Sequence, residues 1–319
     1  NLALSATALG ACFGLFPIVW IVITAVWVYN MTVESGEFEI IKTSLANLTD
    51  DRRLQALFIA FAFGAFIEGT AGFGTPVAIT AAMLVGLGFN PLYAAGICLI
   101  ANTAPVAFGA IGVPVVVAAQ VSALDLMTVT KIVGRQLPFL SIIVPLWLCI
   151  AMCGVQRSLE VLPAILVAGC SFAITQYLSS NFHGPYLPDI MSAIATLVAL
   201  VVLLRFWKPK TTWHFPGETA AAASGPKANY TSGQIIRAWA PYLILAAMVF
   251  VWGLQSFKDL VASTVMSSQW PGLHEMVVKT IPVAKADTPY AAKFTLNLVT
   301  AGGTAILFSG LISSFVMPA

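Results

Sequence analysis

The residue best suited to chemistry is a single carboxylate, Glu68, inside an almost entirely apolar run over residues 61–117. An ionised side chain at the centre of a bilayer costs at least about 2.5–3.5 kcal/mol, so such a residue is by default a functional one. Because burial favours the protonated form of a carboxyl group, Glu68 is suited to carry a proton. In the structural alternative, Glu68 lies near the membrane surface and stabilises the positive end of a neighbouring helix.

Three glycines follow this carboxylate and break the apolar run. The candidate ligands of a substrate carboxylate at this break are Gly69, Thr70, Gly72, Gly74 and Thr75, which precede Pro76. Glycines let the backbone turn and let a ligand approach it closely, and the free N–H groups at a helix N-terminus attract anions. The alternative is close helix packing between small residues. No Lys-Ser/Thr pair follows, which argues against a nucleotide-binding loop.

A second break, Asn102-Thr103-Ala104-Pro105, divides the same run. Asn102 and Thr103 can cap the helix that follows, bind substrate and a coupling ion, or do both. Arg135, further along the chain, is a candidate partner for a substrate carboxylate because a guanidinium binds carboxylates bidentately. Its alternative role is that of an interfacial arginine whose charged head reaches water.

The helices that must position these residues are short. Residues 54–67, 76–87 and 91–101 would form helices of about 21, 18 and 17 Å, less than the roughly 30 Å of a hydrocarbon core. Thr49-Asp50-Asp51 and Asn90-Pro91 are typical helix starts. We therefore expect half-helices that meet at the breaks, a pattern that marks the binding sites of membrane transporters.

The composition indicates a helical integral membrane protein. The chain is 59% hydrophobic and 9% charged, with a net charge of +2 and a mean hydropathy of +0.91, whereas soluble domains are about 25% charged. Long continuous apolar runs argue against an outer-membrane barrel. No basic patch for nucleic acid, no catalytic residue set, no metal motif and no cofactor motif is recognisable, so we expect a transporter rather than an enzyme.

The organisation along the chain is predicted as a transmembrane part over 1–207, with its broken-helix core at 54–121, and a second transmembrane part over 233–319. The hydrophilic segment 208–232 between them is predicted to be cytoplasmic because its surroundings carry an excess of Lys and Arg. Further predictions are one helical crossing over 8–31, an amphipathic surface or re-entrant piece over 122–136, a loop over 154–160, and amphipathic helices within 255–300. The first residue is Asn, and we expect the chain to be a segment of a longer polytopic protein.

Several long stretches resemble the bacterial L-lactate permease family, whose members also carry glycolate. They include EGTAGFGTPVAITAAMLVGLGFNPLYAAGICLIANTAPVAFGAIGVPVVVAAQV, VGRQLPF, AGCSFAITQYLSSNFHGPYLPDI, TSGQIIRAWAPYLIL and TAILFSGLIS. The resemblance extends over essentially the whole chain. It implies a multi-pass secondary transporter in the bacterial inner membrane, driven by the proton gradient.

The resemblance also implies an inverted-repeat fold with a helical hairpin and a helix broken at an Asn-Thr element, which Asn102-Thr103 matches. This chain would hold one half of that architecture, so that the segment alone should not transport. The expected function is proton-coupled symport of lactate and similar 2-hydroxy monocarboxylates, with Glu68 as the proton carrier and a lipid bilayer as surroundings. The alternatives are a sodium-coupled carboxylate transporter and a passive anion channel.

Overall fold

The computed structural model describes residues 1–70, 72, 75–122, 124–215, 230–281 and 286–317. Its helices are α1 (Leu2–Phe13), α2 (Trp20–Glu34), α3 (Glu37–Ala46), α4 (Arg52–Ala56), α5 (Gly64–Thr70), α6 (Thr75–Gly86), α7 (Pro91–Ala101), α8 (Gly109–Ser122), α9 (Leu126–Leu159), α10 (Leu162–Phe182), α11 (Pro188–Phe206), α13 (Ser232–Gly253), α14 (Gln255–Leu260) and α15 (Gly302–Ser314). The π-helical turns η1 (Gly14–Val19) and η2 (Leu57–Phe63) and the 3₁₀ turns η3 (Val106–Phe108) and η4 (Ala262–Thr264) lie between them.

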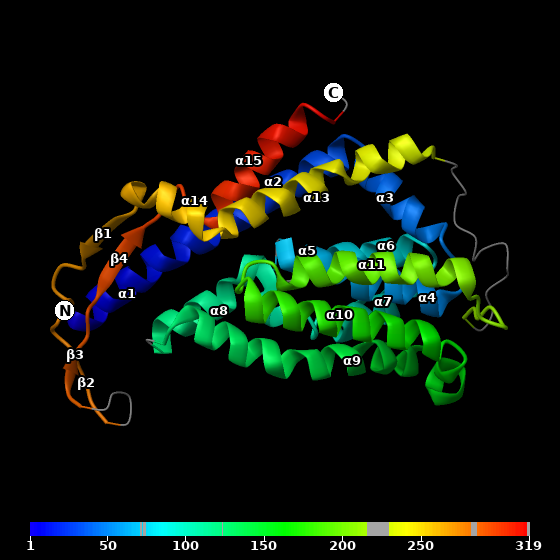
Figure 1. Ribbon diagram of the computed structural model, residues 1–319, viewed down its shortest axis with the longest axis horizontal. Helices are drawn as coiled ribbons and strands as arrows, with labels where there is room; N and C mark the ends of the chain where they lie inside the picture. The colour runs from blue at the N-terminus through cyan, green and yellow to red at the C-terminus, as the bar shows by residue number, and fades with distance from the viewer. Residues whose placement is uncertain (71, 73–74, 123, 216–229, 282–285, 318–319) are drawn as a thin grey trace.

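The helices form two layers (Figure 1). One layer holds α4 to α11, in which α10 packs between α9 and α11. The other holds α2, α13 and α15, which run across the first layer. In the described part of the chain, five helical stretches are long and apolar enough to cross a membrane, or six if the bent pair of α7 and α8 counts as one span. The protein is thus a polytopic helical membrane protein, as the composition predicted.

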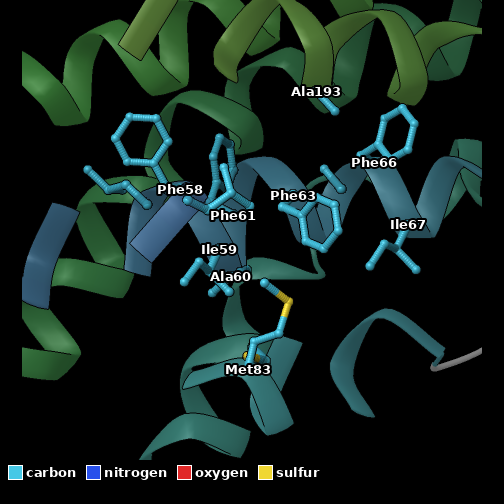
Figure 2. Packing of buried hydrophobic residues seen from close by; sticks show 14 of the residues in the cluster. Phe58, Ile59, Ala60, Phe61, Phe63, Phe66, Ile67, Met83 and Ala193 are labelled. Atoms are coloured by element: carbon cyan, nitrogen blue, oxygen red, sulfur yellow. The ribbon is translucent and has the colours of Figure 1, made fainter. Parts of the chain in front are cut away.

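The central span is one helix over residues 52–70, made of α4, η2 and α5. All of its residues are buried. This helix is longer than the half-helix predicted over 54–67, at about 28 Å. It begins earlier because Asp51 caps it by accepting a hydrogen bond from the backbone N–H of Arg53. Its phenylalanines pack against the surrounding helices (Figure 2), with Phe61 5.2 Å from Phe172 between ring centroids.

The predictions for the two short helices after this span are confirmed. α6 ends at Gly86, and α7 covers residues 91–101 as expected. Asn90 caps α7 by accepting a hydrogen bond from the backbone N–H of Leu92 at 3.0 Å, and Pro91 follows in the first turn, where its missing N–H is harmless. Local sequence signals are sufficient to predict both helices.

The predicted single crossing over 8–31 is wrong. α1 and α2 are separated by η1, and Phe16 has extended backbone angles of φ −143° and ψ 125°. The residue before a proline avoids the helical region, because the proline ring contacts its backbone and Cβ. Pro17 therefore interrupts this helix, although the apolar pattern continues across it.

The predicted surface or re-entrant piece over 122–136 is also wrong, because most of these residues belong to the long helix α9, which begins at Leu126. Asp125 caps its first turn and accepts a hydrogen bond from the backbone N–H of Thr128 at 2.8 Å. Charged side chains on the exposed side of a long helix gave this segment the appearance of a surface piece. The predicted loop over 154–160 is confirmed in part: Gly154, with φ 76° and ψ 169°, breaks α9, and the residues after it up to Leu159 form a short helical piece.

Segment 255–300 contains strands where amphipathic helices were predicted. After α14, the described residues form two small antiparallel sheets, in which β1 (Met266–Gln269) pairs with β4 (Lys293–Leu296) and β2 (Val278–Lys279) with β3 (Thr288–Pro289). These sheets lie beside α1 at one end of the molecule (Figure 1). Isolated two-stranded ladders have weak sequence signals, since they bury no extended apolar face.

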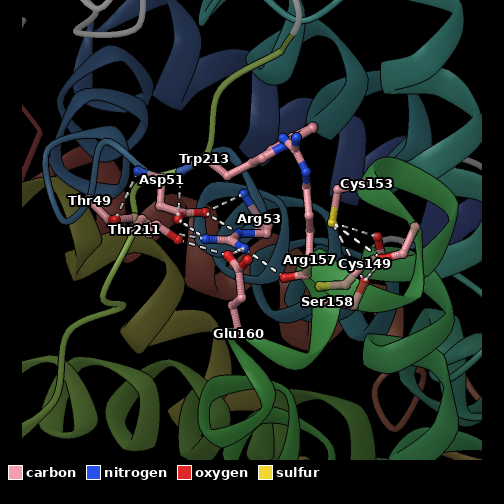
Figure 3. Close-up of polar contacts among 11 residues, drawn as sticks. Thr49, Asp51, Arg53, Cys149, Cys153, Arg157, Ser158, Glu160, Thr211 and Trp213 are labelled. Atoms are coloured by element: carbon pink, nitrogen blue, oxygen red, sulfur yellow. Dashed lines mark hydrogen bonds and ion pairs between the residues drawn. The ribbon is translucent and has the colours of Figure 1, made fainter.

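The start of the predicted hydrophilic linker is packed against the helices. Arg53 is fully buried and donates hydrogen bonds to Asp51 at 2.7 Å, to Glu160 at 2.8 Å and to the backbone carbonyl of Thr211 at 2.8 Å (Figure 3). Trp213 is buried and donates its backbone N–H to Asp51 Oδ2 at 3.1 Å. This Arg53 network joins the start of α4, the end of α9 and the chain after α11.

Candidate functional site

The two helix breaks predicted from the sequence lie against each other. The first break separates Thr70, the end of α5, from Thr75, the start of α6. Its described central residue, Gly72, is buried and has a φ of +60°. A Cβ on Gly72 would lie 2.6 Å from the Cβ of Ala110, at the start of α8, which is closer than two such atoms can approach. Only glycine fits at this crossing point.

The second break is a sharp bend. The axes of α7 and the helix that follows it differ by 72°. Ala110, Ile111 and Gly112 have consecutive positive φ values of 47°, 57° and 72°. For a residue with a side chain this conformation costs roughly 1–2 kcal/mol, and strain of this kind concentrates at functional sites, where the surrounding structure enforces it.

Glu68 lies at this crossing, in the last turn of α5. Its side chain is only 4% exposed. A Cβ on Gly109 would collide with Glu68 Oε1, so the second break leaves room for the carboxyl group. The Asn102 side chain lies close enough to this carboxyl to interact with it. Among the described residues, Glu68 Oε2 and Asn102 Oδ1 have no hydrogen-bond partner. Buried polar atoms normally have one, so this pair is available to a ligand.

Asp189 of α11 faces the same site. This carboxylate was not among the site residues predicted from the sequence. It is 1% exposed, and its Oδ2 has no hydrogen-bond partner in the described part of the chain. A Cβ on Gly69 would lie 2.9 Å from the Asp189 Cβ, and Asp189 interacts electrostatically with Glu68. Pro188-Asp189 reads as an ordinary helix start with an acid in the first turn, which is why the sequence pattern alone gave it no special role.

A glutamine connects Asp189 to the second break. Gln176 Nε2 lies 3.5 Å from Asp189 Oδ1 and 3.3 Å from the carbonyl oxygen of Ala104, and can donate to both. Its Oε1 accepts a hydrogen bond from Ser141 Oγ at 2.8 Å. Gln176 is fully buried. The amide therefore has a fixed orientation with its donor side toward Asp189.

Other predicted site residues have different surroundings. The Thr70 hydroxyl donates within its own helix to the carbonyls of Phe66 and Ile67, both at 3.1 Å. Thr103 is exposed, and its hydroxyl donates to the carbonyl of Ile100 at 2.7 Å. These contacts anchor the two hydroxyls to helix ends.

The remaining predicted residues are Gly69, Arg135, Gly74 and Thr75. Gly69 packs tightly on α11. Arg135 is exposed on α9 and donates from Nε to Asn181 Oδ1 at 3.3 Å. Gly74 and the side chain of Thr75 lie outside the described residues. The structure thus brings together Glu68, Gly72 and Asn102 of the predicted set, and adds Asp189 and Gln176.

The chain matches a family model described as L-lactate permease over residues 1–318. It is 50% identical to the L-lactate permease of Bacillus subtilis (strain 168), over 98% of this chain and 59% of that protein. It is also 50% identical to the glycolate permease GlcA of Escherichia coli (strain K12), over 99% of this chain and 60% of that protein. The L-lactate permease of Streptococcus iniae is 34% identical, over 96% of this chain and 60% of that protein.

No solved structure matches the chain significantly. The chain spans about three fifths of the length of the curated relatives that it matches. Family model and relatives agree over nearly all of its residues, the broken-helix core included. The chain therefore belongs to the L-lactate permease family.

Proposed function

We propose that the complete protein containing this chain is a secondary active transporter that carries lactate or glycolate together with a proton across the bacterial cytoplasmic membrane. The relatives named above are lactate and glycolate permeases of bacteria, which supports this substrate class and location. The observation that carries the proton coupling is the buried carboxyl of Glu68 at the crossing of two helix breaks, close to the side chain of Asn102. A transporter, rather than an enzyme, is the role we assign.

The chemistry of the site fits a 2-hydroxy carboxylate. The N-terminal end of α6 at the first break offers free N–H groups to the carboxylate of the substrate. Asn102 Oδ1, which has no partner among the described residues, can accept a hydrogen bond from the substrate hydroxyl. A proton on Glu68 removes one negative charge, so that carboxyl and bound anion can share a buried site.

The test is uptake of labelled L-lactate by cells that lack their own permeases and express the complete gene product. Accumulation above the external concentration that an uncoupler abolishes is expected for proton symport. Accumulation that depends on a sodium gradient instead would favour a sodium-coupled carrier. Uptake that stops at equilibrium and ignores the pH gradient would favour an anion channel. Both results would overturn the proposed coupling.

A further inference from the structure

Two buried carboxyl groups, Glu68 and Asp189, lie on neighbouring helices at the crossing of the breaks. They are 4% and 1% exposed. α5 and α11 are in close contact at Gly69, the residue after Glu68, where a Cβ would lie 2.9 Å from Asp189 Cβ and 3.0 Å from the backbone nitrogen of Ile190. Each carboxyl has one oxygen with no hydrogen-bond partner among the described residues. Two buried acids with unused acceptor atoms therefore share one site.

No cation in the described helices neutralises this pair. The elements packed against α5 and α11 contribute as titratable groups Tyr93 and Cys98 of α7, Cys170 and Tyr177 of α10, and Arg205 in the last turn of α11. Arg205 is 16 residues from Asp189, about 24 Å along the helix. At the near end, Lys258 of α14 stacks over the Tyr186 ring at 4.4 Å.

The other positive side chains around the bundle have separate contacts. Arg53 pairs with Asp51 and Glu160, and Arg135 bonds Asn181. In the described part of the chain, neither Glu68 nor Asp189 forms an ion pair. Two ionised carboxylates without a cation repel each other strongly in a buried site, so the pair holds at least one proton while the site is closed.

Both carboxyls are connected to the same break. Glu68 interacts with the side chain of Asn102, the first residue of that break. Asp189 is linked through Gln176 to the carbonyl oxygen of Ala104, two residues later. A change of protonation at either carboxyl therefore changes the polar contacts of the segment between α7 and α8.

We infer that Asp189 is the second carboxyl of the proton site, and that Gln176 positions it against Glu68 and the Asn102–Pro105 break. The proton that moves with lactate is bound by the pair: it enters as the anion enters and leaves as the anion leaves. This inference rests on the proposed proton symport. The competing role for Asp189 is structural, in which a carboxylate in the first turn of α11 stabilises that helix.

The experiment compares the complete protein and its Asp189→Asn variant in liposomes. One assay measures uphill lactate accumulation driven by an imposed pH gradient. The other measures exchange of labelled for unlabelled lactate at equal pH, which needs no net proton movement. Asp125→Asn is the matched control, because it makes the same change at an exposed carboxylate that caps α9, and asparagine caps a helix as well as aspartate does.

For Asp189→Asn we expect loss of uphill accumulation with retained exchange, whereas Asp125→Asn should keep both. Accumulation by Asp189→Asn equal to that of the control would overturn the inference. Failure of the proposed function is distinguishable, since the unmodified protein would then show no proton-driven accumulation at all.

A second measurement does not require an asparagine at position 189. In the Glu68→Gln variant, Asp189 remains the titratable member of the pair. The rate of lactate exchange by this variant should still depend on pH. The midpoint of this pH dependence should lie at a lower pH than in the unmodified protein, because the neighbouring like charge is gone. Exchange independent of pH in Glu68→Gln would show that Asp189 takes no proton, and the inference would fail.

Discussion

Gly72 and Ala110 are in contact so close that a Cβ on Gly72 would lie 2.6 Å from the Cβ of Ala110. Gly72 lies in the first helix break, and Ala110 lies 38 positions later in the kinked start of α8. The contact holds the first break against the start of α8, beside the carboxyl of Glu68.

Substitution Gly72→Ala should destabilise the protein and abolish uptake. The added Cβ must displace the second break, which typically costs about 1–3 kcal/mol for overpacking, in addition to about 1–2 kcal/mol for the positive φ. The measurement is thermal unfolding of the purified complete protein, with lactate uptake beside it. Gly36→Ala is the control, because Gly36 has a φ of +76° with open space around its Cβ position. Equal losses in the two variants would show that backbone strain, not the contact with Ala110, is responsible.

Substitution Glu68→Gln should abolish uphill lactate uptake and leave the protein in the membrane. The amide has nearly the shape of the carboxyl but binds no proton in the physiological range, so the coupling is lost while packing at Gly109 is kept. Uptake with and without an uncoupler, normalised to the amount of protein in the membrane, measures this. Glu39→Gln makes the same change at an exposed pair with Lys42 and should transport normally. Retained accumulation by Glu68→Gln would exclude Glu68 as the proton carrier.

Substitution Arg53→Met should be strongly destabilising. Arg53 is fully buried and pairs with Asp51, itself 1% exposed, so its removal leaves a buried carboxylate without its cation. Breaking one side of a buried pair costs about 3–5 kcal/mol. Lys42→Met breaks an exposed pair instead, worth about 0–1 kcal/mol. Denaturant unfolding measures the free energy of unfolding of both variants. Comparable losses of this free energy in Arg53→Met and Lys42→Met would contradict a structural role for the Arg53 network.

Glu160 should make the stability of the protein depend on pH on the acid side. Hydrogen bonds from Arg53 and Thr211 lower the pKa of the Glu160 carboxyl below its usual value. A group with a lowered folded-state pKa stabilises the protein above its unfolded pKa, and this contribution is lost as the pH falls through the folded pKa. The stability difference between the unmodified protein and Glu160→Gln should therefore be largest near neutral pH and shrink in acid.

Thermal unfolding across a pH series tests this prediction. Glu34→Gln, at the exposed end of α2, provides the control for a generic charge effect. A difference between the unmodified protein and Glu160→Gln that stays constant from neutral to acid pH would contradict the prediction.

Much of the local structure could be predicted because short-range signals determine it. The apolar length of the segments predicts membrane spans. Asp51 and Asn90 start helices through their own side chains, and the glycines after Glu68 and the pair Asn102-Thr103 end them. Prediction failed where a local signal was overridden or absent, as at Pro17, over the first turns of α9, and in the strands of 255–300.

The amino-acid sequence is sufficient to identify a helical membrane protein with a carboxylate and two breaks in one apolar run, because hydrophobicity and backbone preference act over a few neighbouring residues. The packing of the helices shows in addition that Asp189, 121 positions after Glu68, faces it across the contact of α5 and α11. It also shows that Gln176 links this acid to Ala104. Such pairings come from the packing of helices distant in the chain, and no local pattern encodes them.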